Sequence, residues 1–234
     1  FTGILPVLHE NGTGMKNSYI TYKRLLVPII YSANCEIKID NCVKIRKLGQ
    51  NIMLIKGDTG EKKDMLKGKK IGVIGGGKMG SALISGILSR DLIPAGNVTV
   101  SDVAKERRED LKKTCAVNTS EDNKKTVEGA DIVILAIKPQ NMAEILQETA
   151  GVFDRKKLII SIAAGISTLF IEGYLRKGAR VIRVMPNTPA MIGEGAAAIA
   201  GGANVTEGDM AVARYIFEAV GITVSVKEDL MDAV

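Results

Sequence analysis

Residues 71–82 read Ile-Gly-Val-Ile-Gly-Gly-Gly-Lys-Met-Gly-Ser-Ala, and this stretch decides the fold. A short, β-branched apolar run enters a cluster of glycines, and a helix-compatible segment leaves it. Gly75, Gly77 and Gly80 have the G-x-G-x-x-G spacing, which lets a pyrophosphate approach the backbone because no Cβ atoms stand in the way. A strand before and a helix after the glycines favour dinucleotide binding over a plain structural turn.

Apolar strand-like runs alternate with helical patterns from residue 69 onward. The predicted strands cover residues 71–74, 98–101, 131–137, 158–163, 180–184, 196–200 and 222–226. The predicted helices cover residues 79–90, 105–113, 142–150, 169–176 and 207–220, with a short one ending at 126–130 after a turn at 118–122. This alternation predicts an α/β fold with a doubly wound, mostly parallel sheet, which is a Rossmann-like domain.

The charge, cysteine and histidine content narrows the classes of function that the chain can have. The net charge is +6, but residues 65–234 hold 22 Lys and Arg against 20 Asp and Glu, so no nucleic-acid partner is indicated. The three cysteines have no metal-ligand spacing, which favours a cytoplasmic protein without a metal site. The only histidine is His9, so a catalytic histidine is excluded from the glycine-rich part.

The first 64 residues differ in kind from the rest. They show no sustained helical or strand period, and their most apolar run, 25–31, is interrupted by Pro28 and too short to span a membrane, so no membrane partner is expected. We expect residues 1–64 to be a poorly structured extension, or translated upstream sequence with the true start at Met65. A small N-terminal domain is the alternative. The Rossmann domain is then expected over residues 65–227.

An acidic residue follows the second predicted strand, about 20 residues after the glycines. An Asp at this position, here Asp102, usually accepts hydrogen bonds from the adenosine ribose and favours NAD. Ser101 precedes it, and Lys105, Arg107 and Arg108 follow it, which suits the 2′-phosphate of NADP. Asp102 also fits the role of a helix N-cap equally well. The choice between NAD and NADP therefore stays open.

Three further segments follow predicted strands. Pro139 ends the third strand after Lys138, and small residues that include Ala163 and Ala164 end the fourth. Asn187 lies in a rigid loop between Pro186 and Pro189. Because the carboxyl ends of parallel strands share one edge of the sheet, we expect all three segments beside the cofactor.

Together these motifs resemble those of pyrroline-5-carboxylate reductases. The resemblance rests on the glycine segment, Ala136-Ile-Lys-Pro, Ser161-Ile-Ala-Ala-Gly-Ile, Arg183-Val-Met-Pro-Asn-Thr-Pro and Glu228-Asp-Leu-Met-Asp-Ala-Val. It covers residues 68–234, with Gly80 where the family often has alanine. The resemblance implies hydride transfer from NADPH, or alternatively NADH, to the C=N carbon of 1-pyrroline-5-carboxylate.

The resemblance also implies roles for individual residues. Glu228 matches a substrate-binding position. Residues 228–234 match the beginning of the linker to a helical domain, which would form the homo-oligomer and complete the catalytic site. The β-hydroxyacid dehydrogenases and a non-enzymatic dinucleotide-binding domain are the alternatives. The implied cofactor-binding residues are Gly75, Gly77, Lys78, Met79, Gly80, Ser101, Asp102, Asn123, Ala136, Ile137, Lys138, Pro139, Ala163, Ala164 and Asn187.

Overall fold

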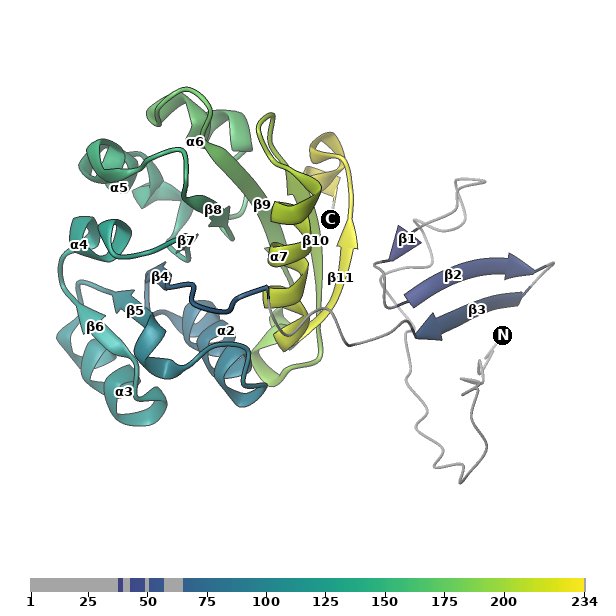
Figure 1. The fold of residues 1–234 in the computed structure, drawn as a ribbon, viewed down its shortest axis with the longest axis horizontal. Helices are drawn as coiled ribbons and strands as arrows, with labels where there is room; N and C mark the ends of the chain where they lie inside the picture. The colour runs from purple at the N-terminus through teal and green to yellow at the C-terminus, as the bar shows by residue number, and fades with distance from the viewer. Residues whose placement is uncertain (1–37, 40–42, 49–50, 57–64, 234) are drawn as a thin grey trace. The chain divides into compact units, whose positions relative to one another are not determined.

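The chain divides into two compact units, Phe1–Gly60 and Glu61–Val234 (Figure 1). The structure is a computed structural model that describes residues 38–39, 43–48, 51–56 and 65–233. In the first unit, the described strands β1 (Lys38–Ile39), β2 (Val43–Leu48) and β3 (Asn51–Lys56) form an antiparallel sheet in that order. Most of the predicted N-terminal extension lies outside the described residues.

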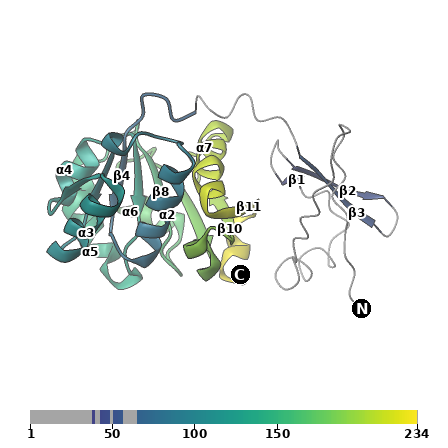
Figure 2. The same cartoon turned by 90° about the horizontal axis from the view of Figure 1, so that it is seen from below.

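The second unit is built on an eight-stranded sheet in the order β11-β10-β9-β8-β7-β4-β5-β6, whose strands are labelled in Figure 1. Figure 2 shows β10 and β11 next to each other. Strands β4 to β9 run parallel, β10 runs antiparallel to β9, and β11 runs parallel to β10. The predicted doubly wound, mostly parallel sheet is therefore confirmed. Its strands are β4 (Ile71–Ile74), β5 (Val98–Ser101), β6 (Asn118–Ser120), β7 (Ile132–Leu135), β8 (Leu158–Ser161), β9 (Arg180–Pro186), β10 (Gly195–Gly201) and β11 (Gly221–Ser225).

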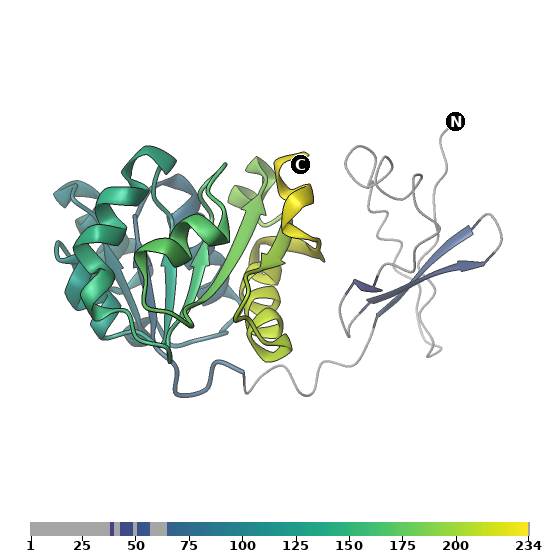
Figure 3. The same cartoon turned by 90° about the horizontal axis from the view of Figure 1, so that it is seen from above.

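Helices cover both faces of this sheet (Figure 3). The side chains of β7 show why, because Ile132 and Ile134 join one hydrophobic cluster while Val133 and Leu135 join another. A strand with both faces buried is apolar at every position. Helices α2 (Lys78–Ser89), α3 (Lys105–Cys115) and α7 (Glu207–Phe217) pack into the first cluster. Helices α4 (Asn123–Glu128), α5 (Met142–Thr149) and α6 (Thr168–Tyr174) pack into the second.

The turn predicted over residues 118–122 is wrong in its first half. Asn118–Ser120 forms the edge strand β6, which pairs in parallel with Thr99–Ser101 of β5. Its Asn-Thr-Ser sequence has no apolar alternation, so only pairing with β5 makes it a strand. The predicted strands 131–137 and 158–163 end earlier, at Leu135 and Ser161, which leaves their last residues in loops at the carboxyl edge.

Short 3-10 turns connect several of these elements. They are η2 (Ala95–Asn97), η3 (Pro139–Asn141), η4 (Ala150–Val152), η5 (Thr188–Ile192), η6 (Glu218–Val220) and η7 (Glu228–Ala233). Among the residues that the structure describes, no helix is both long and apolar enough to cross a bilayer.

Candidate cofactor site

The glycine turn between β4 and α2 is held by close backbone contacts. Gly75 has a φ of +104°, and a Cβ atom added there would overlap the carbonyl group of Ala136. A Cβ atom added at Gly80 would in turn overlap the carbonyl oxygen of Gly75. A side chain at either position would require the neighbouring backbone to shift, since the chain passes very close to itself in this turn.

Gly77 is different, because the fold places no demand on it. Its φ of −70° suits any residue, and a Cβ atom added there would meet nothing within 4 Å. Gly77 is the N-cap of α2, and no side chain among the described residues caps this helix end. The first backbone N–H groups of a helix have no partners within the helix, and the helix dipole attracts anions there. A glycine beside such open space suits the close approach of a phosphate group.

Asp102 lies beneath this turn and is only 8% exposed. Its Oδ2 accepts a hydrogen bond of 2.8 Å from the Gly76 backbone N–H, and its Oδ1 accepts one of 2.8 Å from the Ala104 N–H. Ala104, not Asp102, is the N-cap of α3, so the capping alternative is wrong. The Arg107 guanidinium lies 3.4 Å from Oδ2, and its side chain is 58% exposed.

Two other predicted adenosine contacts are buried. Ser101 is fully buried, and its hydroxyl oxygen has no hydrogen-bond partner among the described residues. Asn123 is the first residue of α4, and its side-chain amide donates to the Glu148 carboxylate at 3.0 Å. Neither side chain is thus presented openly to the surface beside the glycine turn. Val103, which follows Asp102, is 89% exposed.

The three other predicted segments do share one edge of the sheet. Strands β7, β8 and β9 are neighbours and parallel, so the loops that leave their carboxyl ends lie next to one another. Asn187 is held in place, because its Oδ1 accepts a 2.9 Å hydrogen bond from the Ala196 N–H. The members of these loops on the candidate site are Ala136, Ile137, Lys138 and Pro139 after β7, Ala163 and Ala164 after β8, and Asn187 after β9.

Glu228 makes contacts that the sequence did not indicate. Its carboxylate accepts hydrogen bonds of 2.6 Å from the Thr168 backbone N–H and 2.5 Å from the Thr168 hydroxyl, at the beginning of α6. The buried Arg183 lies 4.0 Å from Glu228 and forms a 2.6 Å ion pair with Asp232. The sequence contained one signal for these contacts. Arg183 lies within the apolar run of β9, and a buried charged side chain needs a partner. These contacts hold η7 against α6 and β9.

Glu172 on α6 belongs to the same region. Burial raises the pKa of its carboxyl above the ordinary value of 4.5, and the Glu228 carboxylate adds to the rise, while a hydrogen bond from the Ala203 backbone opposes it. Its Oε1 is buried without a hydrogen-bond partner among the described residues.

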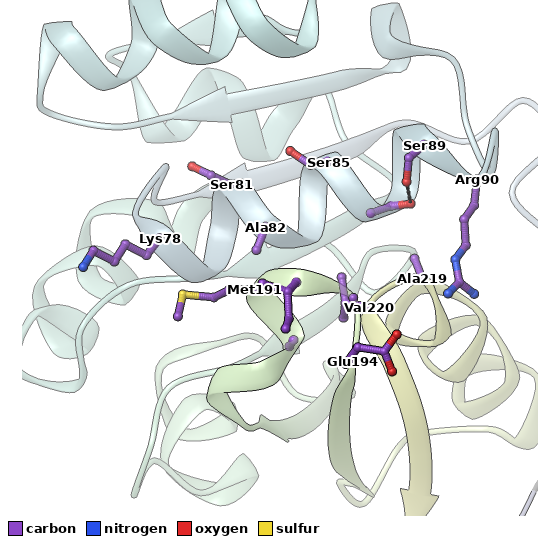
Figure 4. A pocket seen from close by; sticks show the side chains of 14 residues that line it. Lys78, Ser81, Ala82, Ser85, Ser89, Arg90, Met191, Glu194, Ala219 and Val220 are labelled. Carbon is purple, nitrogen blue, oxygen red and sulfur yellow. Dashed lines mark hydrogen bonds between the residues drawn. The ribbon is translucent and has the colours of Figure 1, made fainter. Parts of the chain in front are cut away.

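A hollow adjoins the glycine turn at one end. It lies between α2 and the turns η5 and η6, with Lys78 and Ser81 at the beginning of α2 and Met191 and Glu194 on the opposite wall (Figure 4). Most of the α2 side chains that line it are serine or alanine, so mostly short side chains project from the helix into the hollow. Within the described part of the chain, no three His, Cys, Asp or Glu side chains gather as a metal site would require.

A mostly parallel sheet, in which a strand turns through a glycine loop into a helix, defines a Rossmann-like domain. A family model described as "NADP oxidoreductase coenzyme F420-dependent" matches residues 70–165. In sequence, the domain is similar to the N-terminal portion of pyrroline-5-carboxylate reductases.

The similarity extends over most of the second unit. The chain is 43% identical over 169 residues to the pyrroline-5-carboxylate reductase of Methanosarcina acetivorans, which covers 72% of this chain and 63% of that protein. The structure of a pyrroline-5-carboxylate reductase from Coxiella burnetii superposes with a TM-score of 0.67 at 30% identity, over 70% of this chain and 61% of that one. The Plasmodium falciparum pyrroline carboxylate reductase with NADP bound gives 0.64 at 30% identity, over 70% and 60%. The chain thus spans less than two thirds of the length of these relatives.

Proposed function

We propose that this chain is the cofactor-binding part of a pyrroline-5-carboxylate reductase, which reduces 1-pyrroline-5-carboxylate to L-proline in the last step of proline biosynthesis. The observation that carries the proposal is the placement of the matching segments. The glycine turn and the loops after β7, β8 and β9 come from distant parts of the chain, yet all follow carboxyl ends of one parallel sheet. Relatives that match this part of the chain over 153 to 169 residues carry this enzyme name.

The glycine turn is assigned to the pyrophosphate. Gly77 leaves open space beside the uncapped beginning of α2, which fits an anionic group close to the backbone. Lys78 and Met79 follow in the first turn of the helix, and the exposed Lys78 adds a positive charge there. Gly75 and Gly80 contribute by allowing the tight turn that aims the N–H groups.

The loops after β7 to β9 are assigned to the nicotinamide end. When bound, the reduced nicotinamide supplies the hydride for the C=N carbon of the substrate. Residues 136–139 and the small Ala163 and Ala164 would let the planar ring lie against backbone, and the fixed Asn187 would orient it. Glu228 is assigned to the substrate side of this edge.

The remaining functions of the enzyme are assigned to the portion of the relatives that lies beyond the region matched by this chain. That portion would complete the substrate site, hold the proton donor and form the homo-oligomer. A biosynthetic enzyme of this kind would work in the cytoplasm.

NADPH is the proposed cofactor, with NADH as the alternative. Arg107 supports this choice, because its guanidinium is largely exposed beside the buried Asp102 and can meet a 2′-phosphate. Lys105, which is also largely exposed, adds positive charge in the same turn of α3.

Binding and turnover are tested separately. The full chain is titrated with NADPH and NADH while nicotinamide fluorescence is followed, and failure to bind either coenzyme contradicts the cofactor assignment. NADPH oxidation with 1-pyrroline-5-carboxylate is then measured for the chain extended by the C-terminal portion of the Methanosarcina relative. Turnover of 3-hydroxy acids instead of the imine would indicate a β-hydroxyacid dehydrogenase. Tight binding with no turnover of either would indicate a non-enzymatic binding domain.

A further inference from the structure

The Asp102 carboxylate is turned inward, towards the glycine turn. Each of its oxygens accepts a 2.8 Å hydrogen bond from a backbone N–H, Oδ2 from Gly76 and Oδ1 from Ala104. The residue is 8% exposed, whereas the adjacent Val103 is 89% exposed. The chain therefore presents Val103 at this edge of the sheet and keeps the carboxylate below it.

This orientation does not suit an acceptor for the adenosine ribose. Such a carboxylate must offer its oxygens to hydroxyl groups that arrive from the surface. Here Oδ2 already accepts from the buried Gly76 N–H, which would otherwise have no partner, and an unpaired buried donor is costly. Oδ2 also lies 3.4 Å from the Arg107 guanidinium, and Oδ1 accepts from the half-buried Ala104 N–H.

Gly76 is an additional glycine, which the G-x-G-x-x-G spacing does not require. A Cβ atom added there would lie 2.7 Å from Leu111 Cδ1 and 3.5 Å from Asp102 Oδ2. The absence of a side chain lets this peptide unit pack down onto α3 and onto the carboxylate. Gly76 N–H thus points into the protein, while the next residue, Gly77, faces open space.

We propose that Asp102 is a positioning residue, which fixes the Gly75–Gly76 peptide and so aims the N–H groups at the beginning of α2 towards the pyrophosphate. The inference rests on the proposed dinucleotide binding. Because the pyrophosphate is common to NADPH and NADH, Asp102 supports both coenzymes and does not choose between them. A ribose acceptor would instead support NADH alone.

The Asp102→Asn variant of the full chain separates these roles. An asparagine can accept a hydrogen bond from only one of the two N–H groups, and its own NH2 faces the other donor. We expect the dissociation constants for NADPH and NADH both to rise about tenfold, because the variant loses one charge-assisted hydrogen bond that holds the turn. We also expect a changed amide resonance for Gly76 in a ¹⁵N–¹H spectrum.

The Asp209→Asn variant is the matched control. Asp209 is 7% exposed and forms a capping box with Thr206 at the beginning of α7, so it is buried to the same degree and also holds a helix end. It should lose thermal stability without a change in coenzyme affinity, because α7 does not carry the glycine turn.

Several results would overturn the proposal. They are a loss confined to one coenzyme, opposite changes for the two coenzymes, and unchanged affinity for both. If the wild-type chain bound neither coenzyme, the proposed function itself would fail, which is a distinct result. Should Asp102→Asn not fold, amide hydrogen exchange in the wild type still decides the point. The Gly76 amide must exchange more slowly than the Gly77 amide, and equal rates would remove the hydrogen bond on which the proposal stands.

Discussion

Substitution of Gly77 by alanine separates the demands of folding from those of cofactor binding. The φ and ψ angles of Gly77, −70° and −176°, suit alanine, and the new methyl group meets no atom within 4 Å. Alanine restricts the unfolded chain, which stabilises the protein by about 0.4–1 kcal/mol. Alanine is also a poorer N-cap than glycine by a similar amount, so the free energy of unfolding should change by less than about 1 kcal/mol.

Cofactor binding should respond much more strongly to the Gly77→Ala change. The methyl group would occupy the space that we assign to a phosphate oxygen, and the displaced phosphate would lose at least one hydrogen bond from the beginning of α2. One hydrogen bond to a charged group contributes about 1.5–3 kcal/mol. We therefore expect the dissociation constant for NADPH to rise at least about tenfold, as measured by fluorescence titration, with Tm measured on the same sample.

Gly96→Ala is the matched control. A Cβ atom added at Gly96 also meets nothing within 4 Å. Gly96 lies in η2, just before β5, and so at the amino end of the parallel strands, whereas the glycine turn lies at their carboxyl end. This variant should bind NADPH as the wild type does. If the Gly77→Ala and Gly96→Ala variants both kept wild-type affinity, the assignment of the glycine turn to the pyrophosphate would be refuted.

Three further outcomes are expected. The Arg107→Ala variant should bind NADPH about tenfold more weakly and NADH almost unchanged, because only NADPH carries the 2′-phosphate; equal losses in parallel titrations would contradict this. Gly75→Ala should lower Tm by about 5 °C or more, because the positive φ and the overlap with the Ala136 carbonyl together cost more than about 2 kcal/mol. The raised pKa of Glu172 means that the folded state keeps this proton to higher pH than the unfolded chain, so stability falls as pH rises from the ordinary 4.5 through the raised pKa. The Glu172→Gln variant should therefore have a higher Tm than the wild type at about pH 7, and its Tm should fall less between about pH 5 and pH 7. If the Tm of the variant fell as steeply as that of the wild type, another group would be responsible for the pH dependence.

Local pattern predicted the central strands well. The bounds of β4 and β5 were predicted without error, and β7 was recognised because Ile132, Val133, Ile134 and Leu135 are apolar at every position. Burial on both faces selects such runs, so they are visible in the sequence. The edge strand β6 was missed because its residues are polar and pairing with β5 alone decides its conformation.

The candidate site was predicted in its outline but not in its orientations. The sequence indicated that loops after successive strands would meet at one edge, since parallel strands share their direction. It did not indicate that Ser101 would be buried or that Asn123 would bind Glu148. Which way a side chain points depends on atoms contributed by other elements of the fold.

The sequence by itself determined the fold class and the glycine turn, because spacing and periodicity are local properties that any chain carries with it. The tertiary structure decided what each glycine of that turn does. Gly75 and Gly80 lie directly against other backbone atoms, whereas Gly77 faces open space. It likewise decided that the Asp102 carboxylate lies beneath the turn, since the hydrogen bond to Gly76 joins residues 26 positions apart in the chain.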